Sequence, residues 1–116
     1  MALVDLSGAY DLHVHASPEL FDRLGDEVDL ARHAVATGLA GILVKNHFES
    51  TVGRAALADK LVEGTRVFGG LVLNHSAGGL NPLAVETALR LGARQIWMPT
   101  VDAAAHGKSF GNLGGF

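Results

Sequence analysis

The chain has 116 residues, of which 48% are hydrophobic and 18% charged, with a net charge of −3 and no cysteine. This length fits one domain with one core, and the apolar content is too high for intrinsic disorder. Nucleic-acid binding, disulfides and thiolate metal ligands are not expected, and no apolar run reaches the ~20 residues of a membrane span. We expect a soluble, cytoplasmic protein.

Four apolar, β-prone runs recur along the chain about every 30 residues, which is the size of a β/α unit. The predicted strands are residues 9–14, 40–44, 67–73 and 95–98. Each of the three segments between them has an N-cap residue at its start and a glycine where a helix would end. The start and end residues are Asp26 and Gly38, Thr51 (or Ser50) and Gly64, and Asn81 (before Pro82) and Gly92.

Alternating strands and helices with right-handed crossovers predict a parallel sheet. Four such units are about half of a TIM-like (β/α)8 barrel, which takes ~250 residues. We therefore expect an α/β half-barrel domain over residues 1–106, followed by a glycine-rich tail over 107–116 with no fourth helix. Three explanations stay open: a longer barrel truncated in the tail, two chains that complete one barrel, and a small open sheet with unprotected edges.

Polar residues gather where the predicted strands end, which is where parallel α/β folds place their sites. Histidine is the most informative of these residues. Five of the six histidines end or follow a predicted strand, namely His13, His15, His47, His75 and His106. The sixth, His33, falls inside the first predicted helix and is expected on its surface.

His13 and His15 are two residues apart, so both should point to the same face of their strand. Two imidazoles a few Å apart can chelate one divalent cation. If every strand directs its last histidine inward, His47 and His75 join them as metal ligands. Imidazole ligands without thiolate favour zinc, with manganese or iron as alternatives.

Other residues near the strand ends suggest supporting roles. Asp11 is expected to orient a ligand imidazole through its ring N–H, while Leu12 and Val14 should point outward onto the helices. Lys45 would bind an anionic substrate or, if carboxylated, bridge two metals. The alternative is that it reaches outward or pairs with Asp11 or Glu49. Asp102 is either an acid/base or the N-cap of a missing helix.

The segment 11–15 (DLHVH), followed about 30 residues later by Lys45-Asn46-His47, resembles the metal-dependent hydrolase superfamily of barrels, which comprises amidohydrolases and PHP phosphoesterases. The blocks 70–75 and 97–102 resemble an amidohydrolase-like branch of it. The resemblance implies that H-x-H binds catalytic metal and that Lys45-Asn46-His47 corresponds to the T-D-H motif of PHP proteins. Asn46 replaces the aspartate of that motif, no glutamate ends the third strand, and the general base would lie beyond residue 116.

The resulting hypothesis is the N-terminal half of a metal-dependent hydrolase that uses a metal-activated water on an amide, lactone or ester-type small molecule. The candidate catalytic residues are His47, His75, Lys45 and Asp102, and the candidate substrate contacts are Lys45, Asn74 and His106. A PHP-like phosphoesterase or a metal-dependent decarboxylase or lyase would use the same ligands. A non-catalytic, truncated or degenerate barrel that self-assembles is the third alternative. The expected partners are the substrate and either a second copy or a missing C-terminal half.

Overall fold

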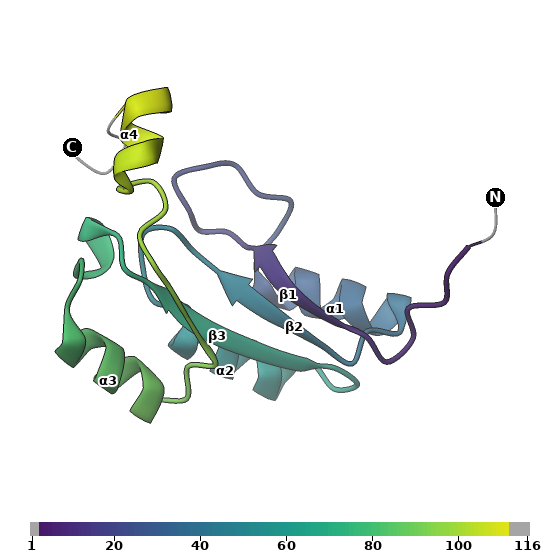
Figure 1. Ribbon diagram of the computed structural model, residues 1–116. Coiled ribbons are helices and arrows are strands. Elements are labelled where there is room, and N and C mark those ends of the chain that lie inside the picture. The colour runs from purple at the N-terminus through teal and green to yellow at the C-terminus, as the bar shows by residue number, and fades with distance from the viewer. Residues whose placement is uncertain (1–2, 112–116) are drawn as a thin grey trace.

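Strands and helices alternate along the chain in the computed structural model, which describes residues 3–111 (Figure 1). In chain order they are β1 (Tyr10–His15), α1 (Glu27–Thr37), β2 (Gly41–Lys45), α2 (Val52–Leu61), β3 (Arg66–Val72), the 3₁₀ turn η1 (His75–Ala77), α3 (Pro82–Arg90), β4 (Gln95–Trp97) and α4 (Ala104–Phe110). The strands pair in parallel in the order β1-β2-β3-β4. The predicted α/β half-barrel is confirmed, and every predicted strand end lies within one residue of the observed one.

One face of the sheet packs against α1 and α2, which lie behind the strands in Figure 1. The core between them joins β-branched residues of the strands, such as Val44 and Val67, to helix alanines such as Ala34 and Ala58. Small helix residues let the backbones approach closely, and glycine serves the same purpose on the sheet. A Cβ at Gly69 would lie 2.6 Å from the carbonyl oxygen of Thr51 at the start of α2.

The predicted starts of α1 and α3 and the predicted end of α1 are confirmed by their caps. Thr51 precedes α2 as predicted, but its hydroxyl donates to the Val44 carbonyl oxygen and does not cap the helix. Asp26 accepts the backbone N–H groups of Val28 and Asp29 in a capping box, and Gly38 ends α1 in the left-handed conformation. Asn81 caps α3 in the same way, ahead of Pro82. None of the helices within residues 3–111 is long and apolar enough to cross a membrane.

The opposite face of the sheet, which would line the inside of a barrel, is uncovered within the described residues. A hollow of about 530 Å³ lies over it. Its border is apolar at Tyr10, Leu12, Leu43 and Phe68 and polar at Arg66, Arg94 and Gln95. In Figure 1 this is the face turned toward the viewer, with the helices behind or beside the strands. An apolar sheet face of this kind is normally buried in a complete barrel.

Two expectations are wrong. Leu12 does not point onto the helices: its side chain is 65% exposed and borders the hollow. The reason is a register irregularity between Asp11 and Val14, which interrupts the strict alternation of sides along β1. Val14 does pack against the helix-side core as expected.

The second correction concerns the region after β4. Residues 104–110 form a fourth helix, α4, which runs through the expected boundary between residues 106 and 107. Ala104 and Ala105 are strong helix formers and begin it ahead of the glycines. Figure 1 shows α4 at the end of the sheet where the strands finish. Residues 112–116 of the expected tail lie outside the described residues.

Candidate metal centre

Histidines of β1 and of the loop after β2 come together at the carboxyl end of the sheet. The Nε2 atoms of His13 and His15 lie 3.1 Å apart, and the ring centroids of His15 and His47 lie 4.8 Å apart. The bulge of β1 does not separate the two rings, so the expected shared face of His13 and His15 is observed. Three imidazoles therefore line one edge of the open face.

The spacing of the two Nε2 atoms suits a shared cation. Zinc binds imidazole nitrogen at ~2.0–2.1 Å, so two such ligands at a near-tetrahedral angle lie about 3.3 Å from each other. The 3.1 Å between His13 and His15 is close to this value. Without a cation, two facing nitrogens this close require that one donates its proton and the other accepts it.

Glu19, in the loop after β1, brings a buried carboxylate to the same place. Its side chain is 0% exposed, with Oε2 3.3 Å from His15 Nδ1 and Oε1 accepting the backbone N–H of His47 at 3.2 Å. Arg23 Nε donates to Oε2 at 2.7 Å. Burial alone would raise the pKa of Glu19, but the hydrogen bonds from Arg23 and His47 outweigh it and lower the pKa. The carboxylate is therefore anionic at neutral pH.

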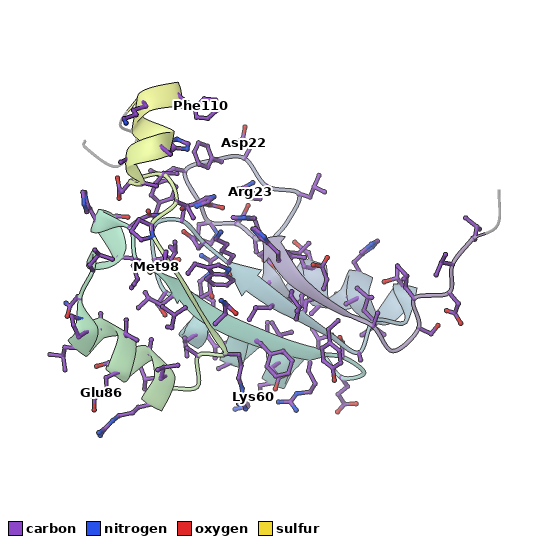
Figure 2. All side chains as sticks on the ribbon, viewed as in Figure 1. Asp22, Arg23, Lys60, Glu86, Met98 and Phe110 are labelled. Atoms are coloured by element: carbon purple, nitrogen blue, oxygen red, sulfur yellow. The ribbon has the colours of Figure 1, made fainter. Side chains whose placement is uncertain are left out.

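One ligand atom each from His15, Glu19 and His47 lie within 4.8 Å of one another, so these three residues form a second group that could hold a cation. His15 belongs to both groups because its two ring nitrogens face different neighbours. The guanidinium group of Arg23 lies beside this second group of residues, with its Nη2 atom 3.3 Å from His15 Nδ1. Figure 2 shows Arg23 in the loop that overhangs the ends of the strands.

The loop that carries Glu19 is held by side chains of the neighbouring unit. Asn46 Nδ2 and Arg54 Nη1 donate to the carbonyl oxygen of Pro18 at 2.9 and 3.0 Å. The peptide bond between Ser17 and Pro18 is cis. Arg54 also forms an ion pair with the buried Glu27. Asn46 is therefore an anchor of this loop.

His47 is held by a network that joins the ends of three strands. Its Nδ1 lies 2.7 Å from Thr100 Oγ1, and the buried Asn74 amide donates to both the His47 carbonyl oxygen and Thr100 Oγ1, at 2.9 and 2.8 Å. Asn74 Oδ1 accepts the Thr100 N–H at 2.8 Å. Asn74 was predicted to contact substrate. Both its amide nitrogen and its amide oxygen instead bond to residues of the site and hold them together.

The protonation state of His47 suits ligation. Burial is the largest cause that lowers its pKa, to about 4, and the nearby Glu19 carboxylate only partly opposes it. At neutral pH the ring is uncharged and has a lone pair available, which is the form that binds metal.

Lys45 points toward the open face rather than outward. The residue is 4% exposed, and Nζ lies 5.2 Å from the centroid of the Trp97 ring. Burial lowers the pKa of its ammonium group, partly offset by Glu19. A cation stacked on an aromatic ring beside the three imidazoles is placed to meet an anionic group.

His75 and Asp102 form a separate pair on the rim. Asp102 accepts the backbone N–H of His75 at 2.6 Å, and its carboxylate lies 3.8 Å from His75 Nδ1. The His75 side chain is 74% exposed. His75 is not part of the cluster of His13, His15 and His47.

Two further candidates lie elsewhere or act differently from expectation. His106 lies on α4 with its ring 5.0 Å from that of Phe110. Asp11 does not orient an imidazole ring: its Oδ1 accepts the backbone N–H of His13 at 3.0 Å, a local turn that accompanies the bulge. The carboxylate that reaches His15 of the centre is that of Glu19.

Comparison with known proteins places this centre within a family. A family model described as a family of unknown function, DUF6282, matches residues 8–115. The chain belongs to the DUF6282 family. No curated protein and no solved structure matches it. The match includes all four strands, so in this DUF6282 chain the cluster of histidines belongs to the family domain itself.

The residues that sequence reasoning missed in this DUF6282 chain are Glu19, Arg23 and the hydroxyl of Thr100. A usable signal was present for the first two. Glu19 and Arg23 follow the H-x-H motif directly, in a loop at the carboxyl end of a strand, where sites in parallel α/β folds are built. Thr100 has no local signal, since its role depends on the return of the chain to the end of β3.

Proposed function

We propose that this chain is the N-terminal half of a metal-dependent hydrolase, amidohydrolase-like, that acts on an amide, lactone or ester-type small molecule. The observation that supports this most directly is the 3.1 Å spacing of the His13 and His15 Nε2 atoms beside the buried Glu19 carboxylate. Nitrogen donors at this spacing fit a borderline metal such as zinc better than magnesium or calcium.

In this proposal His13 and His15 hold the cation, and His47 is a further ligand or stabilises the negative charge that develops on the substrate. A divalent cation held there would polarise a carbonyl oxygen and lower the pKa of a bound water toward ~7. Lys45 adds positive charge beside the imidazoles, which favours substrates with an anionic group. The charge of Arg23 is balanced by Glu19. The low pKa of His47, about 4, keeps its ring uncharged at neutral pH, which favours the ligand role over proton transfer.

The uncovered sheet face supports a further part of the proposal, which is that the barrel is completed by other residues. Tyr10, Leu12 and Phe68 would then be covered either by a C-terminal half or by a second copy of the chain. Completion would also enclose the metal centre on its open side. Enclosure strengthens electrostatic interactions with a reacting group.

Metal content tests the proposal. We expect the chain, stripped with EDTA and titrated with zinc in a calorimeter, to bind about one ion tightly, and the variant His13→Ala to lose this binding. His33→Ala, which removes an exposed histidine of α1, is the matched control and should bind as the wild type does. A chain that takes up neither zinc nor manganese would contradict the proposal and favour the non-catalytic alternative.

Substrate class is tested on the loaded protein, with a panel of amides, lactones, esters and generic phosphoesters. Hydrolysis of the first three groups that is lost in His13→Ala supports the amidohydrolase-like proposal. Manganese-dependent hydrolysis of phosphoesters alone would favour the PHP-like alternative.

A further inference from the structure

We infer that Glu19 is a positioning residue that fixes the tautomer of His15, and that Arg23 keeps the Glu19 carboxylate in place for this task. The inference deepens the proposed function, since it concerns how the ligand imidazoles are prepared for a cation. It differs from the simplest interpretation of the cluster, in which Glu19 is itself a ligand together with His15 and His47.

The two ring nitrogens of His15 have different neighbours. Nε2 faces Nε2 of His13 at 3.1 Å, and Nδ1 faces Glu19 Oε2 at 3.3 Å. A neutral imidazole carries one N–H and one lone pair. With the proton on Nδ1, His15 donates to the carboxylate and its Nε2 lone pair is free to join His13 on a cation. In the metal-free protein this lone pair accepts the Nε2–H of His13, which is lost when a cation takes its place. With the proton on Nε2, His15 is itself the donor to His13 and has no lone pair on that nitrogen for a cation.

Both oxygens of Glu19 are already engaged in ways that favour positioning over ligation. Oε1 accepts the backbone N–H of His47, and Oε2 accepts Nε of Arg23 at 2.7 Å while facing His15. A carboxylate that holds the far nitrogen of a ligand imidazole is a recurrent arrangement in metal sites, and it sets the orientation and basicity of the ring. In this chain the carboxylate is that of Glu19, in the loop after β1, and not that of Asp11.

Arg23 has a second contact that would act in the opposite direction if it dominated. Its Nη2 lies 3.3 Å from His15 Nδ1 and can only donate, which would require a lone pair there. Its bond to Glu19 is shorter and joins opposite charges in a buried place, so the guanidinium serves the carboxylate. The anionic Glu19 carboxylate then accepts the hydrogen bond from His15 Nδ1–H.

The direct test is the tautomer of His15 in the metal-free protein, read from long-range ¹H–¹⁵N NMR spectra of the imidazoles. We expect Nδ1 protonated in the wild type and a shift toward the Nε2-protonated form in Glu19→Gln, whose amide can donate to Nδ1. Glu86→Gln, at a carboxylate of α3 whose side chain is 56% exposed, is the matched control and should leave the tautomer unchanged.

A second readout uses metal affinity. Glu19→Gln should weaken zinc binding 10–100-fold, the usual effect of losing such a partner, while the absorption spectrum of the cobalt-loaded variant keeps the wild-type coordination number. Arg23→Lys should have a smaller effect of the same sign. These affinities are compared after circular dichroism has shown that each variant is folded.

Three results would overturn the inference: a lone pair on His15 Nδ1 in the wild type, an unchanged tautomer in Glu19→Gln, or a cobalt spectrum with one ligand fewer in that variant. The last would make Glu19 a ligand. The wild-type tautomer is measured without metal and without a variant. A chain that binds no cation therefore contradicts the proposed function, while the tautomer still decides the inference.

Discussion

The carboxylate of Glu19 lies against the imidazole of His15, with 3.3 Å between Oε2 and Nδ1, while the other nitrogen of the same ring faces His13. His15 is therefore the residue through which the loop after β1 and the H-x-H motif are joined. His13, His15 and His47 belong to the metal centre, whereas His75 pairs with Asp102 on the rim.

The first prediction concerns His75, which the sequence pattern groups with the metal ligands. Its side chain is 74% exposed and paired with Asp102 on the rim. We expect His75→Ala to change zinc affinity by less than about twofold and His15→Ala to lower it by several orders of magnitude, because imidazole nitrogen is a principal zinc ligand. Isothermal titration calorimetry of both variants measures this, and a large loss in His75→Ala would show that the rim pair closes onto the site.

The second prediction concerns the Asn74 network. This fully buried amide bonds to His47 and twice to Thr100. Asn74→Ala leaves these buried groups without partners and should lower the free energy of unfolding by about 2–3 kcal/mol. Urea denaturation measures the loss. Asn81→Ala, which removes only the cap of α3, should cost about 1 kcal/mol; equal losses would contradict the central role of Asn74.

The third prediction is a pH dependence of stability in the EDTA-treated protein. The pKa of His47 is about 4 in the folded chain, below the usual 6.5 of a histidine, because the ring is buried. Between these values the unfolded chain binds more protons, so this contribution to stability is complete above about pH 6.5 and is lost as the pH falls toward 4. Since the ring is partly exposed, we expect a loss of about 1–2 kcal/mol.

Urea denaturation across this pH range measures the effect, and His47→Gln is the comparison. The variant lacks the titrating ring, so its stability should change less between pH 7 and pH 4 than that of the wild type. An identical pH profile for both proteins would show that His47 is not held in its neutral form by the fold.

The fourth prediction concerns the uncovered sheet face. We expect the 116-residue chain to self-associate through this face, and size-exclusion chromatography with light scattering measures its mass. Leu12→Lys, on the open face, should shift the chain toward monomer. Leu57→Lys on α2 is the matched control, since the two leucines are 65% and 66% exposed. A wild-type chain that is a stable monomer would contradict this expectation.

Much of the fold was predictable because its signals are local. The alternation of apolar strands with capped helices gives the parallel order, and Asp26, Gly38 and Asn81 mark helix ends through their own backbone contacts. The errors have equally local causes. The bulge in β1 moved Leu12 to the open face, and the alanines before Gly107 formed α4 where a glycine-rich tail was expected.

The candidate site was predictable only where the motif itself defines the geometry. His13 and His15 are placed by the two-residue period of a strand. Glu19 and Arg23 sit in an irregular loop, and their approach to His15 depends on the anchoring of Pro18 by Asn46 and Arg54 from other units. The place of this loop after the H-x-H motif marks it as part of a site, but no spacing in the sequence encodes its contacts with these distant segments.

The central claim, that His13 and His15 share a cation, is tested most directly by X-ray absorption spectroscopy at the zinc edge on the loaded chain and on His13→Ala and His15→Ala. The account predicts about one zinc per chain with imidazole nitrogens at ~2.0–2.1 Å, and loss of tightly held zinc in either variant. Zinc bound with the same ligand shell in both variants, or no zinc bound by the wild type, would contradict it.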